Sequence, residues 1–565
     1  MRALIFRVLF VAFVLASIAA ARNSGAGEAY PYRWVFAFGK NLNDDASLKT
    51  IEEWADTSAA HGLNGMVLGA DLDGILSWDA AALERLKKLK QHCDDKKIEL
   101  IPLVLSAGYG SGVIQQDPNL CEGLPAKDVL FTVKGGEANV TPDTPVSAAD
   151  GTFENHKGDE LKCFDFQDGP GKCTFIDTTV THDGKSSLRM ENFADNKNRV
   201  RLIKELPIPN RHYVVRLYAK AAGLKGTLSA CIYDGEEQIS RLNFHLKDGA
   251  DWQKIEFSVN SLVDKEMKVY IGAWDVKEGK IWVSGVEIFE PGLVNVLRRP
   301  GAPLTVKRDG TGDVFEEGAD FEKVVDKDMA VTHAWHKPPA IKLTANSKIK
   351  EGDKLRVSYY TSGAPMLDKR QPVICMSEPK TFEVWKGIVV RVNEILHPKV
   401  WMLDMDEIRG GGTCALCANR KNTDGSKMTP PQILGACVSN QVQMIRDLNP
   451  TAEVAIWNDM FDPKANAQKH YYTVPGGYEG SWNYLPPKMI VVAWLLDLAD
   501  ESIAHFSKLG HRIVGGAYYD ADDLEGCKVW LKALAKSPSS AGIMYTTWEV
   551  KFALLAAFGD LVSKP

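Results

Sequence analysis

The sequence has little net charge and no basic block, which argues against a nucleic-acid-binding protein. Lys and Arg together number 67 and Asp and Glu 73, so the formal net charge of the 565-residue chain is −6. A nucleic-acid partner requires clustered Lys and Arg, often with interleaved aromatic residues, and no such cluster occurs. Cysteine is also scarce. The chain has only ten, which are too few for its length to form a disulfide scaffold. The length itself suggests two or three domains.

Long apolar runs are missing after the first residues. The opening stretch MRALIFRVLFVAFVLASIAAARNSG has a basic start, an apolar run interrupted by Arg7, and small residues up to Ala21. This pattern is typical of a secretory signal peptide. A membrane anchor is the alternative, but no later stretch approaches the ~20 apolar residues that span a bilayer. We therefore expect an exported protein, periplasmic or extracellular, with no stable membrane insertion after signal cleavage.

Short apolar runs alternate with amphipathic helical patterns in two separate parts of the chain. In the first part, helical patterns at 47–64 and 79–97 separate three predicted strands, YRWVFAFG, GMVLGAD and IELIPLVLS. In the second part, from about residue 377, five more strands follow: KVWMLDM, AEVAIW, KMIVVAW, RIVGGAYYD and AGIMYTTWE. Strands that alternate with helices pair in parallel.

Eight such strands predict an α/β fold: a (β/α)8 TIM barrel, interrupted after strand 3 by a β-sandwich insert of the jelly-roll type. An open doubly wound sheet is the alternative, but no G-x-G-x-x-G or G-x-x-x-x-G-K-[ST] motif follows a predicted strand. The predicted divisions are 1–21 (signal peptide), 30–124 (barrel strands 1–3), 148–291 (jelly roll), 292–376 (a β-rich connecting segment) and 377–565 (barrel strands 4–8).

Acidic and aromatic residues gather at the predicted strand ends, where a TIM barrel has its active site. Strand four ends in KVWMLDMDEIRGGG. The candidates at the ends of strands four to eight are Asp406, Glu407, Trp457, Asp459, Trp494, Tyr518, Asp520, Trp548 and Glu549. Sugar rings stack on Trp and Tyr, and glycosidic cleavage needs a protonated carboxyl beside the leaving oxygen. The set therefore predicts an oligo- or polysaccharide substrate and hydrolysis of a glycosidic bond. Asp404, deeper in strand four, is expected to pair with Arg409 or Arg33.

These strand ends resemble those of the family 20 glycoside hydrolases, the β-N-acetylhexosaminidases, over roughly 30–110 and 377–560. LDMDE is similar to the Asp-Glu that ends the family's fourth strand, and YPYRW places Arg33 where the family holds sugar hydroxyls. The resemblance implies that Glu407 is the general acid/base. It also implies that Asp406 and Tyr518 contact the 2-acetamido group, which is the internal nucleophile in this family. Further matches at the strand ends are Trp494, Asp520, Trp548 and Glu549.

The chain differs from that family at several positions. Met402 stands where the family has His, and Leu105 and Tyr109 stand where it has Asp-x-Pro-Gly-His. A long aromatic-rich loop replaces the helix between strands five and six. Two alternatives therefore remain open. One is a glycosidase that acts on a non-acetamido sugar with Asp520 or Glu549 as second carboxylate; the other is a non-catalytic glycan-binding barrel.

No metal or cofactor is expected from the sequence. The CALC pair, Cys414 and Cys417, has no second Cys or His pair at zinc-finger spacing, so a loop staple or two reduced thiols is favoured over a metal site.

The insert resembles the jelly-roll carbohydrate-binding modules of the family 4/9 type, on segments such as HYVVRLYAKAAG, DWQKIEFSV and GKIWVSGVEIFE. The same jelly roll also serves as a purely structural lid. Five of its aromatic residues are candidate sugar platforms: Tyr213, Tyr233, Trp252, Trp274 and Trp282. At WQKIEF and IWVSGV, however, apolar residues alternate with period two, which favours a core role over sugar contact.

Overall fold

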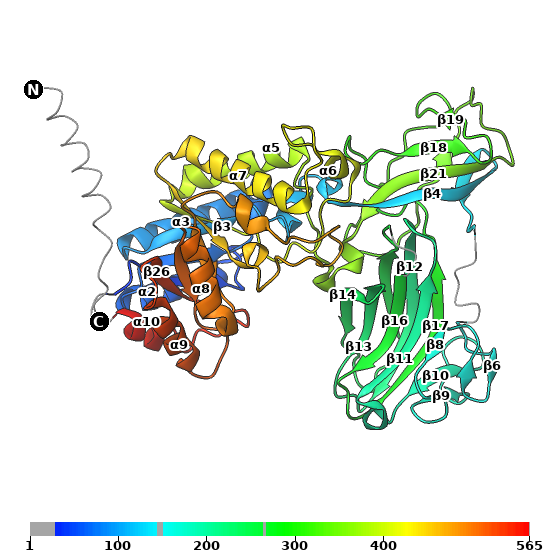
Figure 1. Ribbon diagram of the computed structural model, residues 1–565, viewed down its shortest axis with the longest axis horizontal. Helices are drawn as coiled ribbons and strands as arrows, with labels where there is room; N and C mark the ends of the chain where they lie inside the picture. Colours follow the sequence, from blue (N-terminus) through cyan, green and yellow to red (C-terminus); the bar gives the residue numbers. More distant parts are fainter. Residues whose placement is uncertain (1–28, 144–150, 264–266, 564–565) are drawn as a thin grey trace, which may run out of the picture.

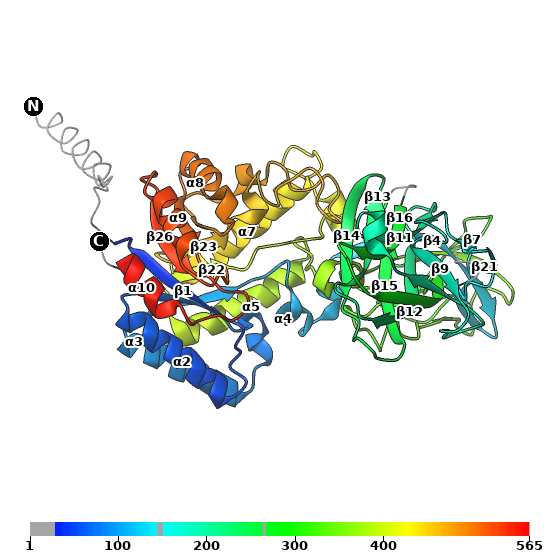
Figure 2. The ribbon, with the colours of Figure 1, turned by 90° about the horizontal axis from the view of Figure 1, so that it is seen from below.

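A computed structural model of the chain describes residues 29–143, 151–263 and 267–563. The predicted signal peptide, 1–21, lies outside the described residues. Within these ranges no helix is both long enough and apolar enough to cross a membrane. Figures 1 and 2 show a barrel with its helices at one end of the molecule and the antiparallel sheets at the other.

Eight parallel strands close into a barrel, as the alternating pattern predicts. In order around the barrel they are β1 (Tyr32–Phe38), β2 (Gly65–Gly69), β3 (Glu99–Val104), β22 (Val400–Leu403), β23 (Glu453–Trp457), β24 (Ile490–Ala493), β25 (Arg512–Gly516) and β26 (Ser540–Tyr545). The barrel closes where β1 pairs with β26, with Tyr32 opposite Gly542. β3 and β22 are neighbours, with Leu103 opposite Met402, although all the other sheets lie between them in the sequence.

Helices connect most of the barrel strands. The α-helices are α2 (Asp45–Ala60), α3 (Ala80–Asp95), α4 (Ser111–Ile114), α5 (Pro379–Leu396), α6 (Ala415–Asn419), α7 (Pro430–Leu448), α8 (Ala499–Lys508), α9 (Glu525–Leu534) and α10 (Leu555–Ser563). Short 3-10 turns are η1 (Leu72–Ser77), η2 (Pro118–Leu120), η3 (Phe193–Asn196), η4 (Ala364–Met366), η5 (Asp368–Arg370), η6 (Asp459–Phe461), η7 (Ser481–Tyr484) and η8 (Leu496–Leu498). Only η6 and η7 lie between β23 and β24, so the aromatic-rich stretch there is a loop, as predicted.

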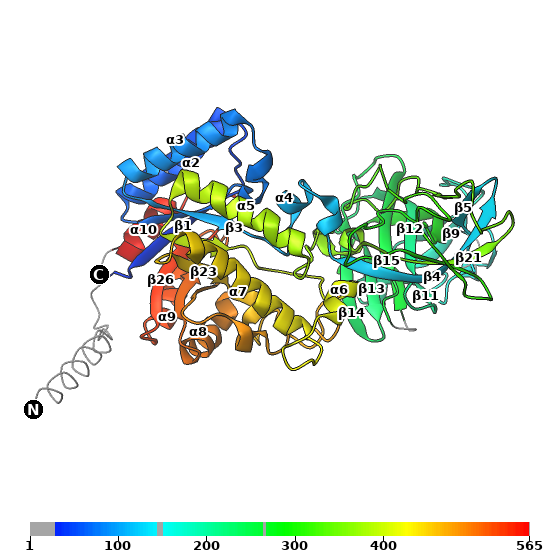
Figure 3. The same ribbon diagram turned by 90° about the horizontal axis from the view of Figure 1, so that it is seen from above.

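Helix α5 illustrates how the sequence specifies a barrel helix. Pro379 stands in its first turn, where the fixed φ of proline suits a helix and the missing N–H is not needed. Trp385, Ile388 and Val392 recur at helical spacing and are buried. The helix ends at His397, whose φ of 43° is left-handed. Figure 3 shows α5 and α7 together along one side of the barrel.

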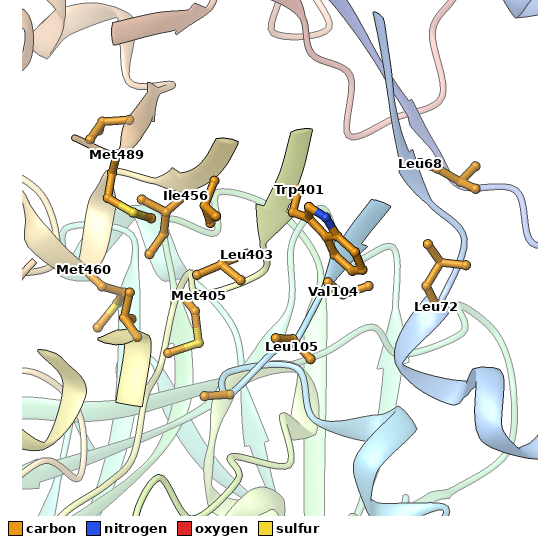
Figure 4. Packing of buried hydrophobic residues seen from close by; sticks show 14 of the residues in the cluster. Leu68, Leu72, Val104, Leu105, Trp401, Leu403, Met405, Ile456, Met460 and Met489 are labelled. Carbon is orange, nitrogen blue, oxygen red and sulfur yellow. The ribbon is translucent and has the colours of Figure 1, made fainter. Parts of the chain in front are cut away.

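Strand β22 is buried on both faces because it lies between the barrel interior and the helices. Met402 belongs to the apolar cluster inside the barrel, whereas Trp401 and Leu403 belong to the cluster that the helices cover. Figure 4 shows Leu403 near Val104 of β3 and Ile456 of β23. The acidic stretch that begins at Asp404 therefore follows directly on a fully apolar strand.

The segment between β3 and β22 forms antiparallel sheets. A six-stranded sheet has the order β19 (Val314–Phe315), β18 (Thr305–Arg308), β21 (Lys354–Ser362), β4 (Gly123–Lys134), β5 (Glu137–Val140) and β20 (Ile341–Lys342). In this sheet β4, where the chain leaves the barrel, pairs with β21, where the chain returns. Strands of the segment 292–376 thus pair with strands of 123–140, and the sequence periodicity did not predict this pairing.

Two five-stranded sheets lie between β5 and β18 in the sequence. One has the order β15 (Gln253–Asn260), β12 (His212–Ala222), β17 (Lys280–Phe289), β10 (Ser187–Met190) and β9 (Thr174–Asp177). The other has the order β14 (Glu237–Phe244), β13 (Leu228–Asp234), β16 (Met267–Trp274), β11 (Arg199–Leu206) and β8 (Phe166–Gln167). A small hairpin joins β6 (His156–Lys157) to β7 (Glu160–Leu161). Apolar residues of both five-stranded sheets share one cluster, which makes the pair sandwich-like.

Candidate functional site

A pocket of about 600 Å³ opens at the carboxyl ends of the barrel strands. All eight strands contribute a lining residue at or near this end, because parallel strands bring their carboxyl ends to one rim. In barrel order these residues are Phe38, Gly69, Leu103, Asp404, Trp457, Trp494, Tyr519 and Trp548. Of the residues predicted from sequence, the pocket lining includes Asp406, Glu407, Trp457, Trp494 and Trp548.

Arg33 and Asp459 do not line the pocket. Arg33 lies near the start of β1, at the other end of the barrel, and its guanidinium donates to the carbonyls of Tyr30 (2.5 Å) and Gly62 (2.8 Å). Asp459 is fully buried, and its Oδ2 accepts from the backbone N–H of Glu407 (3.0 Å) and from Asn466 Nδ2 (2.7 Å). Asp459 therefore fixes the backbone of Glu407 without contacting the pocket itself.

Tyr518 lies outside the pocket as well. It is 3% exposed, stacks on Tyr545 with ring centroids 4.2 Å apart, and donates to the carbonyl of Ala521 (2.7 Å). Its neighbour Tyr519 lines the pocket instead. Successive side chains of an extended segment point to opposite sides, so a shift of one residue exchanges the two tyrosines.

The two acids proposed as alternative second carboxylates are also engaged elsewhere. Asp520 accepts from the backbone N–H groups of Trp548 (2.8 Å) and Glu549 (3.2 Å), and so fixes the loop after β26. Glu549 is exposed and pairs with Lys551 at 2.8 Å. Neither lines the pocket.

Both carboxylate oxygens of Glu407 have a hydrogen-bond or ion-pair partner. Arg409 Nη2 lies 3.1 Å from Oε1, and the hydroxyl of Tyr109 donates to Oε2. Arg409 also pairs with Asp368 at 3.0 Å, so the prediction that it pairs with Asp404 is wrong. The backbone φ of Glu407 is 42°, a left-handed value that a non-glycine residue rarely adopts. Asp459, through the backbone N–H, and Arg409, through the carboxylate, hold Glu407 in this conformation.

Asp404, which is half-buried, and Asp406, which is buried, form an acidic pair at the pocket. Burial raises the pKa of Asp404 to about 6, although hydrogen bonding from Asp406, Ser106 and Trp457 opposes the rise. Burial, followed by the charges of Asp404 and Asp459, raises the pKa of Asp406 well above its usual range. Oδ1 of Asp406 is buried without a hydrogen-bond partner among the described residues. Two neighbouring carboxyls resist double ionisation, which favours retention of a proton by the pair.

Asp73 holds the turn after β3 in place. Its two carboxylate oxygens accept from the backbone N–H groups of Leu105 (2.6 Å) and Ser106 (2.7 Å). Leu105 has a left-handed φ of 64°. The turn ends at Tyr109, whose hydroxyl reaches Glu407, so Asp73 positions Tyr109 through the backbone. Burial raises the pKa of Asp73 to about 7 against the effect of the two hydrogen bonds.

We expect the folded protein to lose stability as the pH rises from about 4 to about 7. An unfolded Asp releases its proton near pH ~3.9, whereas folded Asp73 keeps it up to about pH 7, so the folded state binds more protons across this interval. Asp404 and Asp459, with pKa values raised to about 6, act in the same direction. The variant Asp73→Asn should show a smaller difference in unfolding free energy between pH 5 and pH 7.5, measured by urea denaturation. The exposed Asp497→Asn is the matched control; an unchanged pH dependence in Asp73→Asn would contradict the assignment.

Aromatic rings form one wall of the pocket. Trp494 and Tyr519 stack with centroids 5.9 Å apart at 9°, and Trp548 meets Phe36 edge-on at 5.5 Å. Trp457, at the end of β23, lies 5.8 Å from Trp548. Flat apolar rings opposite buried carboxyls suit a ligand with one apolar face and several polar groups.

Sequence reasoning missed several pocket residues. Asp71 and Asp73 follow β2, and Tyr109 follows β3, so a search for acids and aromatics after the first three strands would have found them. Asn41 and Ser111 carry no local signal that separates them from ordinary loop residues.

A second cavity, of about 790 Å³, lies on the sandwich and is lined by residues that include Arg216, Tyr218, Phe289 and Trp335. None of the five aromatic residues considered from the sequence lines it. Tyr213 is 1% exposed, and Trp282 is 9% exposed with its Nε1 donating to Asp177 at 2.9 Å, so both are core residues. Trp252, for which the sequence also favours a core role, is only half-buried, as are Tyr233 and Trp274.

Comparison with known proteins gives only partial similarities. No family model matches the chain, and no curated protein matches it. Among solved structures it is similar to a family 16 carbohydrate-binding module at 15% identity, over 25% of this chain and 99% of that one, with a TM-score of 0.20. The CBM22-1 xylan-binding domain from Paenibacillus barcinonensis Xyn10C is similar at 13% identity, over 26% and 94%, with a TM-score of 0.20. TmCBM61, solved with β-1,4-galactotriose, is similar at 12%, over 22% and 86%, with a TM-score of 0.18.

Proposed function

We propose that this protein is an exported glycoside hydrolase whose barrel is a TIM barrel with an inserted jelly roll. The observation that carries the proposal is the pocket itself, in which carboxyls and aromatic rings converge from all eight strand ends. The apolar C–H faces of a sugar ring would stack on Trp494 and Trp548, and its hydroxyls would donate hydrogen bonds to Asp404 and Asp71. Its anomeric carbon would face Glu407.

Glu407 is the proposed general acid/base, because it reaches the pocket from the rim and is fixed by three separate contacts. Proton transfer by a positioned side chain requires this kind of restraint. Asp406 lies next to it and carries a buried unpartnered oxygen, which suits contact with a substituent of the sugar. In the substrate-assisted route that substituent is the 2-acetamido group. In a two-carboxylate route the second carboxylate would be Asp404 or Asp406, since Asp520 and Glu549 lie outside the pocket.

A non-catalytic glycan-binding barrel is the second candidate. It is favoured by the engagement of both Glu407 oxygens by Arg409 and Tyr109, because an acid/base must exchange one partner for the glycosidic oxygen.

A substrate screen tests the proposal. The full chain is assayed with a panel of 4-nitrophenyl glycosides and natural polysaccharides, and we expect release of 4-nitrophenol from at least one glycoside. Turnover of N-acetylglucosaminides or N-acetylgalactosaminides supports substrate assistance, whereas turnover confined to other sugars rejects it. Binding of glycans in calorimetry without turnover of any substrate would contradict hydrolysis and support the binding barrel.

A further inference from the structure

Four buried side chains outside the pocket place metal-ligand atoms together: Glu122, Cys375, Cys414 and Cys417. One oxygen of Glu122 and the three sulfurs all lie within 4.8 Å of one another, and all four residues are buried. From the sequence, Cys414 and Cys417 lack a second ligand pair. The fold supplies it from two distant segments.

The sulfur spacing matches a coordination sphere and not a disulfide. Cys375 Sγ lies 3.6 Å from Cys414 Sγ and 3.6 Å from Cys417 Sγ. A disulfide bond is about 2.05 Å long. Sulfur atoms at about 2.3 Å from a tetrahedral zinc ion are about 3.8 Å apart, close to the observed separations.

Glu122 is arranged so that one oxygen is held and the other is directed at the sulfurs. Its Oε1 accepts from the backbone N–H groups of Thr413 (2.8 Å) and Cys414 (2.9 Å), and Oε2 lies 3.6 Å from Cys417 Sγ. A metal-binding carboxylate is commonly fixed in this way by hydrogen bonds to its other oxygen.

Arg299 partly balances the charge that three thiolates and a carboxylate would bring. Its side chain is 4% exposed, and its charge interacts with Cys375, Cys414 and Glu122. It also pairs with Glu378 at 3.0 Å, so one guanidinium does not neutralise the cluster. Three thiolates and a carboxylate bound to one divalent ion would have most of their remaining charge balanced by that ion.

We propose that Glu122, Cys375, Cys414 and Cys417 bind one structural zinc ion. Three thiolates select a soft or borderline metal over Mg²⁺ or Ca²⁺, and four protein ligands in a closed, buried set are typical of structural zinc. The four residues do not line the barrel pocket, so the inference is independent of the proposed hydrolysis.

The ion would link three separate segments of the chain. Glu122 immediately precedes β4, where the chain leaves the barrel, and Cys375 lies where it returns, with Cys121 bridged to Ile374 beside it. Cys414 is the N-cap of α6 and Cys417 lies within it, so both follow shortly after the loop that carries Glu407. The zinc therefore joins the base of the inserted sheets to the loop that forms the pocket.

Metal analysis of the purified full chain tests the site. After dialysis against metal-free buffer, we expect about one zinc ion per chain, measured by inductively coupled plasma mass spectrometry. Cys375→Ser and Cys417→Ser should hold at least fivefold less. Cys437→Ser, which alters a buried cysteine of α7 outside the cluster, is the matched control and should keep the wild-type content. Glu122→Gln should lose zinc to a chelator at a concentration at least tenfold lower than wild type.

Measurements on the wild type keep the test decisive if a cysteine variant fails to fold. Removal of the metal should lower the Tm, and Zn²⁺ but not Mg²⁺ should restore it. Co²⁺ added to the metal-free chain should give the visible absorption of a tetrahedral thiolate site. A chain that binds neither ion, a Cys414–Cys417 disulfide in the purified protein, or wild-type zinc content in both cysteine variants would overturn the proposal.

Discussion

Glu407→Gln should lower kcat on the best glycoside by about 10²–10⁴-fold, the range expected for loss of a general acid/base. Glutamine keeps the size of the side chain and can still meet Arg409 or Tyr109 through its carbonyl oxygen, but it cannot transfer a proton. The glycan affinity should change little, because the aromatic wall is intact. Initial rates together with calorimetric binding of the same substrate separate these two quantities.

Glu549→Gln is the matched control for this substitution. Glu549 is also a strand-end glutamate, but it is exposed, pairs with Lys551 and lies outside the pocket. Its replacement should leave kcat and KM at wild-type values. Unchanged turnover in Glu407→Gln would reject the role assigned to Glu407, and loss of activity in Glu549→Gln would instead support a second carboxylate at that position.

Trp494→Ala should raise KM by roughly tenfold while kcat changes much less. The indole stacks on Tyr519 at the edge of the pocket, so its removal takes one apolar face from a bound sugar. Loss of such a contact is worth about 1.5 kcal/mol, which corresponds to about a tenfold change in affinity. Steady-state kinetics on the 4-nitrophenyl glycoside found in the screen provides the measurement.

Trp482→Ala is the corresponding control, because Trp482 lies in the loop between β23 and β24 and contacts His505 rather than the pocket. Its KM should equal that of wild type. A normal KM in Trp494→Ala would show that the substrate binds away from this wall, and a fall in kcat alone would assign the ring a role in positioning Glu407.

The strand ends were the most predictable part of the site. Parallel strands deliver their carboxyl ends to one rim, so Asp406, Glu407, Trp457, Trp494 and Trp548 could be grouped without coordinates. The prediction failed where it depended on side-chain direction or on which end of a strand a residue occupies. Tyr518 and Tyr519 exchange roles by one residue, and Arg33 lies at the opposite end of β1.

The positions where the chain differs from family 20 also depend on direction. Met402 is not a polar residue missing from the pocket; it packs inside the barrel with Trp457. Leu105 is buried among the helices, while Tyr109 reaches Glu407. The resemblance to family 20 places both at family positions, but the turn held by Asp73 determines which one enters the pocket.

The sequence by itself determined the eight parallel strands, their order and the residue types at their ends, because the spacing of apolar and polar residues is a local property of the chain. Only the tertiary structure decided which strand-end side chains face the pocket, that β4 pairs with β21, and that Glu122 and Cys375 meet Cys414 and Cys417. The β4–β21 pairing and the contact of Glu122 with Cys414 and Cys417 join segments more than 200 residues apart, and their energies arise only once the chain has closed around them.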